Sequence, residues 1–284
     1  MTKLKYTLAI PVKAGLEIIN KYDLRSETSL KDHINDYGEY SDVIFSAHAP
    51  IEFDGQRLNV AAVDVEFKNH SIEVINAYID QCALFPNLSQ INLHFGYKRW
   101  VTNTQINGQF GDYENHVLSI KEIADHALKY DIEIVMENLN SYWAANSISP
   151  DINFFEVDWS NKNEPFGMYP DEWIQMCEDI NKSNVKLSLD SSHVCTYAQR
   201  FPEDDRKNEI MKFFTKPDLI NHVHWSDNYL YDIRGRNDSH LAVGTGTIPL
   251  DFHKIIKGLD ATILLEHYYS EEILIKELAF IDKL

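Results

Sequence analysis

The chain contains eight short runs rich in Val, Ile and Leu that do not alternate strictly with polar residues. Apolar runs of this kind are typical of parallel strands that are covered on both faces. The eight predicted strands span residues 6–11, 16–20, 43–47, 91–95, 132–137, 185–190, 220–225 and 262–267. Between most of them lie longer segments with apolar residues at helical spacing.

Four of these intervening segments predict helices, at residues 63–85, 113–130, 170–180 and 249–259. In the third, Pro170 stands at the first helical position and acidic residues fill the first turn, which is typical of a helix start. The alternation of strands and helices predicts an α/β fold, a (β/α)8 TIM barrel formed by a single domain, residues 1–284. Only four residues separate the first two predicted strands. The first βα unit is therefore irregular, or one of those two strands is assigned wrongly.

Composition narrows the classes of protein that fit. A length of 284 residues suits an α/β barrel, which typically needs about 250, and 44% hydrophobic residues suffice for a folded core. The formal charge of −18 disfavours a nucleic-acid partner, because such a surface repels phosphate unless cations gather locally. The cysteines Cys82, Cys177 and Cys195 form no CxxC pair and fit a reducing compartment. With no apolar stretch long enough for a signal peptide or a membrane span, we expect a cytoplasmic protein.

Six of the predicted strands end at or next to a histidine or carboxylate. These residues follow one another at intervals of 34 to 53 residues and are His48, His94, Glu137, Asp190, His224 and Glu266. In barrel enzymes the carboxyl ends of the strands surround the active site. Mixed imidazole and carboxylate ligands suit Zn, Mn or Fe(II). The pattern therefore predicts a metal-dependent active site.

Several motifs add a family resemblance to this pattern. They are HAP with LNVAAVD (48–64), EN (137–138), LDSSH (189–193), HWSD (224–227), DSHLAVGTG (238–246) and LLE (264–266). In this order and spacing they resemble the xylose isomerase-like TIM-barrel superfamily, over nearly the whole chain from His48 to Glu266. That superfamily contains sugar and sugar-phosphate isomerases and epimerases, and also apurinic endonucleases of the endonuclease IV type.

The resemblance implies a core metal site and a set of additional ligands. The core would consist of Glu137, Asp190, His224 and Glu266. Endonuclease IV holds a three-zinc cluster with further ligands, which match His48, His94, His193, Asp238 and His240 in this sequence. The implied cofactor is thus a divalent metal, Zn or Mn, as one to three ions. The ligand set alone does not decide the function.

The leading hypothesis is an isomerase or epimerase of a small sugar or sugar phosphate. The metal would hold a ketose carbonyl and its adjacent hydroxyl and stabilise the enediolate formed by proton transfer. The resemblance implies that Glu137 and Glu266 move the proton, while His193 polarises a substrate oxygen. Arg234 or Arg236 could hold a phosphate or hydroxyl of the substrate, although a solvated loop charge explains either arginine equally well.

The alternative hypothesis is zinc-dependent phosphodiester hydrolysis at abasic DNA sites, which also requires a basic surface. The predicted loops at 103–116 and 141–169 are acidic, and only 97–99 and 234–236 form basic clusters. The aromatic residues of 141–169 fit a lid over a small ligand, or simple packing on the barrel; they are Tyr142, Trp143, Phe154, Phe155 and Trp159. A non-catalytic metal-binding scaffold is a third possibility. We expect a sugar ligand rather than nucleic acid or a membrane. The sequence leaves open whether the protein forms a homo-oligomer.

Overall fold

Eight parallel strands close into a barrel in the computed structural model, which describes residues 8–29, 37–101, 108–149 and 152–284. In order around the barrel they are β1 (Leu8–Pro11), β2 (Arg25–Thr28), β3 (Ile44–His48), β6 (Gln90–His94), β8 (Glu133–Glu137), β10 (Val185–Asp190), β11 (Ile220–Trp225) and β12 (Thr262–Leu265), which pairs with β1. This confirms the predicted (β/α)8 barrel. The start of the first predicted strand (6–7), part of the predicted acidic loop (103–107) and Asp151 lie outside the described residues.

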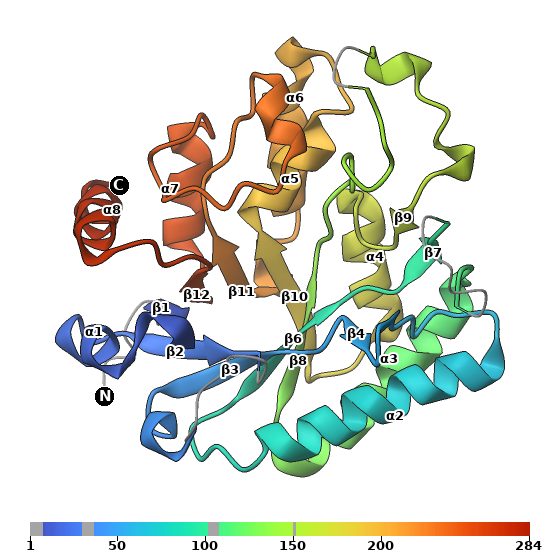
Figure 1. Ribbon diagram of the computed structural model, residues 1–284, viewed down its shortest axis with the longest axis horizontal. Coiled ribbons are helices and arrows are strands. Elements are labelled where there is room, and N and C mark those ends of the chain that lie inside the picture. The colour runs from blue at the N-terminus through green and yellow to red at the C-terminus, as the bar shows by residue number, and fades with distance from the viewer. Residues whose placement is uncertain (1–7, 30–36, 102–107, 150–151) are drawn as a thin grey trace.

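Helices surround the barrel (Figure 1). They are α1 (Leu16–Lys21), α2 (Val65–Cys82), α3 (Tyr113–Ala127), α4 (Pro170–Ile180), α5 (Ser191–Ala198), α6 (Glu203–Met211), α7 (Leu250–Gly258) and α8 (Glu271–Lys283). Short strands β4 (Glu52–Phe53) and β5 (Gln56–Arg57) form a hairpin, and β7 (Tyr97–Arg99) pairs with β9 (Glu164–Pro165). Further 3₁₀ turns lie at 12–14, 37–40, 128–130, 154–156, 159–161, 212–214, 217–219 and 233–236.

All four predicted helices are present, and α4 begins at Pro170 as its sequence indicated. Each is anchored to the core by one apolar face. In α4, Trp173 is fully buried and its indole N–H donates to the Met136 carbonyl on β8 at 3.0 Å. The described helices include none that is both long and apolar enough to span a bilayer.

The first βα unit differs from the prediction. Residues 16–20 form helix α1 rather than a strand, with Ile19 buried and Gly15 at the N-cap. A run as short as this one has no periodicity that separates a buried helix from a buried strand. The second barrel strand is instead β2, whose sequence RSET contains no apolar run. Its Ser26, Glu27 and Thr28 are nevertheless buried, and the Ser26 hydroxyl donates to the Ile10 carbonyl on β1.

The first and last barrel strands, β1 and β12, pair with each other and close the barrel. Helices α1 and α8 lie on the same side of the molecule (Figure 1), and Lys21 of α1 pairs with Glu271 of α8 at 2.5 Å. Tyr22 donates to the same carboxylate at 2.6 Å. Because all eight barrel strands run parallel, their carboxyl ends lie at one end of the barrel. The residues predicted to bind metal are therefore brought to a common location.

Candidate metal centre

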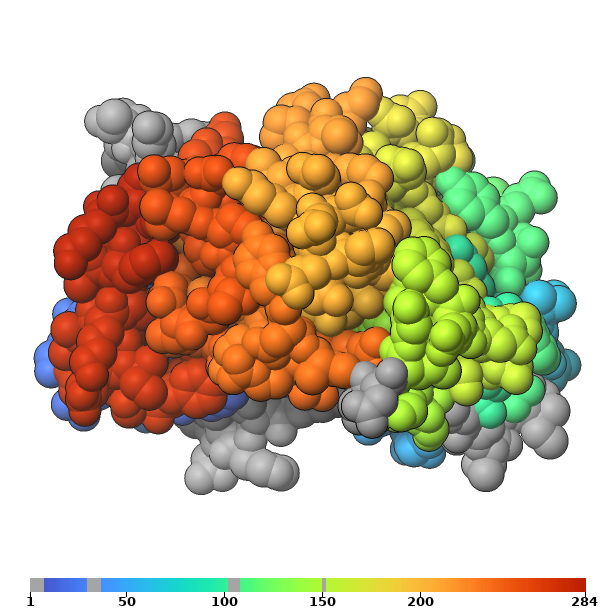
Figure 2. All heavy atoms as spheres, turned by 90° about the horizontal axis from the view of Figure 1, so that it is seen from above, coloured from blue at the N-terminus to red at the C-terminus, as the bar shows by residue number. Residues whose placement is uncertain are grey.

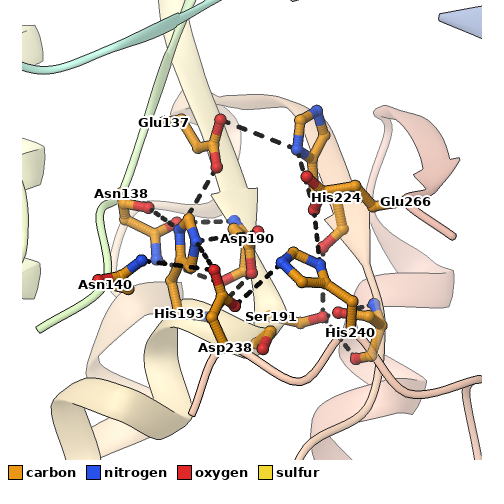
Figure 3. A network of polar contacts seen from close by, with 12 residues as sticks. Glu137, Asn138, Asn140, Asp190, Ser191, His193, His224, Asp238, His240 and Glu266 are labelled. Carbon is orange, nitrogen blue, oxygen red and sulfur yellow. Dashed lines mark hydrogen bonds and ion pairs between the residues drawn. The ribbon is translucent and has the colours of Figure 1, made fainter. Parts of the chain in front are cut away.

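Nine side chains meet at the carboxyl ends of the barrel strands, and they are the nine predicted metal ligands. His48, His94, Glu137 and Asp190 are the last residues of β3, β6, β8 and β10; His224 lies in β11, and Glu266 follows β12. His193 comes from the first turn of α5, and Asp238 and His240 come from the segment between β11 and α7. Seven of these nine residues are labelled in Figure 3, where their side chains point toward a common space.

The centre of the cluster consists of four residues from four consecutive barrel strands. Ligand atoms of Glu137, Asp190 and His224 lie within 4.8 Å of one another, and Glu266 Oε2 is 3.3 Å from His224 Nδ1. Each of the four also has a buried polar atom without a hydrogen-bond partner among the described residues: Glu137 Oε1, Asp190 Oδ2, His224 Nδ1 and Glu266 Oε2. Unpaired buried polar atoms are uncommon and call for an explanation such as an ion. Three carboxylates and one imidazole fit a divalent cation such as Zn or Mn.

Two histidines flank Glu137. The Nε2 atoms of His48 and His94 lie 3.4 and 3.3 Å from Glu137 Oε2 and 3.2 Å from each other. The Asn92 amide also donates to this oxygen from within β6. Two imidazole nitrogens and one carboxylate oxygen within 4.8 Å could hold a second cation.

A third group consists of Asp190 and the residues around it, His193, Asp238 and His240. The backbone N–H of His193 donates to Asp190 Oδ1 at 2.8 Å, so this carboxylate caps helix α5 with one oxygen and leaves the other for the cluster. Asp238 bridges two imidazoles, at 3.0 Å from His193 Nε2 and 3.0 Å from His240 Nε2. His240 has φ of 39°, a left-handed conformation that non-glycine residues rarely adopt. Strain of this kind is typical of functional sites.

The electrostatics of the cluster are dominated by carboxylate–imidazole pairs. Burial favours neutral Glu137, but His94 and His224 outweigh it and hold the pKa of this carboxyl well below its usual range. Burial also disfavours charged His224, yet Glu266 and Glu137 raise the pKa of this imidazole well above its usual value. Burial raises the pKa of Asp190 well above its usual value. In the absence of a cation the His224 imidazole therefore retains its proton, and a metal bound through this ring would have to displace it.

Two residues of this region were missed by the sequence-based prediction. Glu27 of β2 lies below the cluster, with Oε1 3.2 Å from His224 Nε2, and its Oε2 lies 3.3 Å from His222 Nε2. His222 could have been recognised, because residues two apart on a strand point to the same face and His224 was already assigned to the interior. Glu27 gave no comparable signal, since its strand has no apolar pattern.

The two arginines predicted to contact substrate make other interactions. Arg234 is exposed, pairs with Asp232 at 2.7 Å and lies over the Tyr229 ring. Arg236 donates to the Ser149 and Ile152 carbonyls, each at 3.1 Å, and its guanidinium lies 4.2 Å from the Trp143 ring centre. The structure therefore ties Arg236 to the segment 141–169, and contact of either arginine with substrate stays a prediction.

The aromatic residues of 141–169 pack largely against the barrel. Trp143 is buried and donates to the Thr196 carbonyl of α5, and the Arg200 guanidinium stacks 3.6 Å from the ring centre of Trp159. In Figure 2 this yellow-green segment lies beside the orange segment that precedes α7. Phe155 is 69% exposed. Of the two alternatives for these aromatics, packing explains Trp143 and Trp159.

Comparison with known proteins gives the same fold. The family model described as xylose isomerase-like TIM barrel matches residues 12–284. A D-tagatose 3-epimerase-like protein superimposes with a TM-score of 0.64 at 18% identity, covering 98% of both chains. The 3-keto-D-glucoside 4-epimerase YcjR of E. coli gives 0.61 at 15% identity over 99% of this chain and 100% of its own. IolI, solved with a zinc atom, gives 0.61 at 17% identity over 98% and 95%. No curated protein sequence matches. At these identities the structural similarity establishes the fold alone.

Proposed function

The chain belongs to the xylose isomerase-like TIM-barrel family, and on this premise we propose that it is a metal-dependent isomerase or epimerase of a small sugar or sugar phosphate. One observation carries the proposal. Glu137, at the end of β8, and Glu266, just after β12, approach the same His224 Nδ1 at 3.8 and 3.3 Å, and each has a buried oxygen that makes no hydrogen bond to the described residues. Two carboxylates on different sides of one site are what proton transfer at a sugar carbon requires.

The chain's own residues would divide the chemistry as follows. One carboxylate of the Glu137–Glu266 pair takes the proton from the carbon beside the carbonyl, and the C–H electron pair moves toward the carbonyl oxygen. The other, holding a proton, returns one to the opposite face for epimerisation, or to the neighbouring carbon for isomerisation. A divalent cation held by Glu137, Asp190, His224 and Glu266 supplies Lewis-acid stabilisation of the charge that develops on oxygen.

His193 suits the role of holding a substrate oxygen. Its Nδ1 donates to the Asn138 carbonyl at 2.7 Å and its Nε2 faces Asp238. Burial opposes its protonation, but Asp190 and Asp238 raise the pKa of this imidazole well above its usual value. If a sugar oxygen takes the place of Asp238 at Nε2, a cationic imidazole fixed in this way can donate a charge-assisted hydrogen bond to it. The structural relatives named as sugar epimerases support a sugar as the substrate class.

The proposal is tested by solvent deuterium exchange. The metal-loaded protein is incubated in D2O with a panel of ketoses and ketose phosphates, and exchange at the carbon next to the carbonyl is followed by NMR. We expect exchange with at least one sugar, slowed by roughly 10²-fold or more in Glu137→Gln and in Glu266→Gln. Glu133→Gln, the same substitution at the start of β8, should keep the wild-type rate. No exchange across the panel by protein shown to hold metal would contradict an isomerase.

A second candidate function is phosphodiester hydrolysis at abasic DNA sites. The observation that favours it is the pair of additional ligand groups, His48 and His94 with Glu137, and His193 and His240 with Asp190, which an isomerase with one cation does not need. A nuclease should bind three zinc ions and nick an abasic duplex at low salt, and both properties should be lost in His94→Gln. Binding of one metal equivalent without nicking would remove this candidate.

A further inference from the structure

A buried polar layer lies beneath the metal cluster, inside the barrel. It contains Glu27, His222 and Gln90, which are all at most 6% exposed, together with Thr262. The interior of a TIM barrel is usually filled by branched apolar side chains. Burying a carboxylate and an imidazole there is costly unless they satisfy one another. The layer therefore needs an explanation beyond packing.

The contacts of Glu27 determine where the hydrogens lie. An ionised carboxylate only accepts hydrogen bonds. Glu27 Oε2 accepts from the Ser46 hydroxyl at 2.7 Å and faces His222 Nε2 at 3.3 Å, while Oε1 faces His224 Nε2 at 3.2 Å. Both imidazoles thus face the Glu27 carboxylate through Nε2, and a proton on Nε2 is the state that this contact favours.

In a neutral ring with its proton on Nε2, the other nitrogen is an acceptor. On His222, Nδ1 can accept from the Gln90 amide and the Thr262 hydroxyl, each at 2.7 Å. On His224, Nδ1 points to the opposite side, toward Glu137 and Glu266, and has no hydrogen-bond partner among the described residues. The nitrogen that must carry a free electron pair for a metal is thus the one that Glu27 leaves unprotonated.

We propose that Glu27 is a positioning residue that fixes the tautomer and ring orientation of His224 for metal binding, with His222 holding Glu27 in place. The inference rests on the metal site of the proposed function. A carboxylate behind a metal-bound imidazole also raises the basicity of that ligand, and such partners typically contribute 10- to 100-fold to metal affinity. Among the predicted metal ligands, Glu27 forms an ion pair with His224 alone in the described structure, so its effect acts through this imidazole.

A second cation between Glu27, His222 and His224 is the competing explanation, since their ligand atoms also lie within 4.8 Å of one another. The hydrogen bonds argue against it. Glu27 Oε2 already accepts from Ser46, and a His222 ring that lost its Nε2 proton would have to keep one on Nδ1, which faces the Gln90 amide donor. The two explanations differ in the number of metal ions that Glu27→Gln binds: loss of one equivalent relative to wild type would favour the second cation.

The test is metal binding to Glu27→Gln, measured by competition titration with Zn²⁺ or Mn²⁺ against a chelator of known affinity. We expect a 10- to 100-fold weaker dissociation constant with unchanged stoichiometry. Glu27→Asp, which keeps the carboxylate, should recover part of the loss. Glu133→Gln is the matched control. Like Glu27, Glu133 lies on a barrel strand and accepts a side-chain hydrogen bond, here from the Asn221 amide at 2.9 Å, but it makes no contact with a predicted ligand in the described structure.

The tautomer can also be read without any substitution. In zinc-loaded wild-type protein with ¹⁵N-labelled histidine, NMR should show His224 bound through Nδ1 with a proton on Nε2. Binding through Nε2, equal affinity in folded Glu27→Gln, or loss of a whole metal equivalent in that variant would each overturn the proposal. None of these readouts needs a sugar, so failure of the isomerase hypothesis would be visible separately.

Discussion

At the scale of single residues, two of the motifs shared with the family contact each other. Asp227 of HWSD accepts from the backbone N–H groups of Gly244 at 3.0 Å and Ile248 at 3.2 Å, which shapes the GTG turn. Gly246 packs against this carboxylate so closely that an added Cβ would lie 2.3 Å from Asp227 Oδ1 and 2.4 Å from the Asn228 carbonyl oxygen. The motif thus needs glycine here because of close approach.

We predict that Gly246→Ala lowers the free energy of unfolding by about 1–3 kcal/mol, the usual cost of forcing extra atoms into a packed site. Gly258→Ala is the control, because nothing lies within 4 Å of a Cβ at the end of α7. That substitution should be neutral or slightly stabilising. Urea unfolding of both variants is the measurement, and equal stability of the two would contradict the steric argument.

His116 makes the free energy of unfolding depend on pH. Its Nε2 accepts from the Gly96 N–H at 2.9 Å and its ring stacks on Phe95, just after β6. Burial lowers the pKa of this imidazole to about 3, whereas an unfolded histidine titrates near about 6.5. Between these values the unfolded chain binds more protons, so this group makes the protein less stable as the pH falls, by up to about 1.4 kcal/mol per pH unit.

We therefore predict that His116→Gln loses less stability than wild type when the pH is lowered from 7 to 4. Urea unfolding with a chelator present, which removes metal effects, measures the difference. His70→Gln, on an exposed position of α2, controls for loss of an imidazole. A pH dependence of His116→Gln identical to wild type would show that His116 does not stay neutral when folded.

At the scale of elements, the success of the sequence-based prediction follows the apolar pattern. The run 185–190 coincides with β10, and 132–137 differs from β8 by one residue, because both strands are buried on two faces. The apolar pattern does not predict β2, because the interior position of Glu27 is occupied by a carboxylate that pairs with His224 and not by an apolar side chain. Six of the nine predicted ligands follow from the strand-end pattern, the family resemblance adds His193, Asp238 and His240, and the nine side chains lie together. Glu27 was missed because its strand has no apolar pattern, whereas His222 could have been recognised two residues before His224.

The segment 141–169 depends on Arg236, which holds the Ser149 and Ile152 carbonyls and covers Trp143. We predict that Arg236→Ala destabilises this segment by about 1 kcal/mol, from the lost hydrogen bonds and cation–π contact. Limited proteolysis with mass spectrometry should detect faster cleavage within 141–169. Arg234→Ala, which removes contacts with Asp232 and Tyr229 outside this segment, should be cleaved like wild type. A raised KM for sugar with unchanged proteolysis would instead support the substrate contact that the sequence suggested.

At the scale of the whole molecule, the barrel concentrates negative charge where its strands end. The chain carries a formal charge of −18, and the core site brings three of its carboxylates, Glu137, Asp190 and Glu266, next to one imidazole. The unfolded chain separates these groups, so only the folded barrel can hold a cation with all four. Metal binding is therefore linked to folding.

We predict that a divalent metal stabilises the protein by about 2.7 kcal/mol when its free concentration is 100 times its dissociation constant. Calorimetric unfolding with Zn²⁺ or Mn²⁺, compared with a chelator, measures this increment. Asp190→Asn should lose most of it, because the amide keeps the helix cap on α5 but removes a charged ligand. Asp125→Asn, which alters only an exposed pair with Lys182, should keep the full increment. An equal increment in both variants would mean that the metal stabilises the barrel from a site other than this cluster.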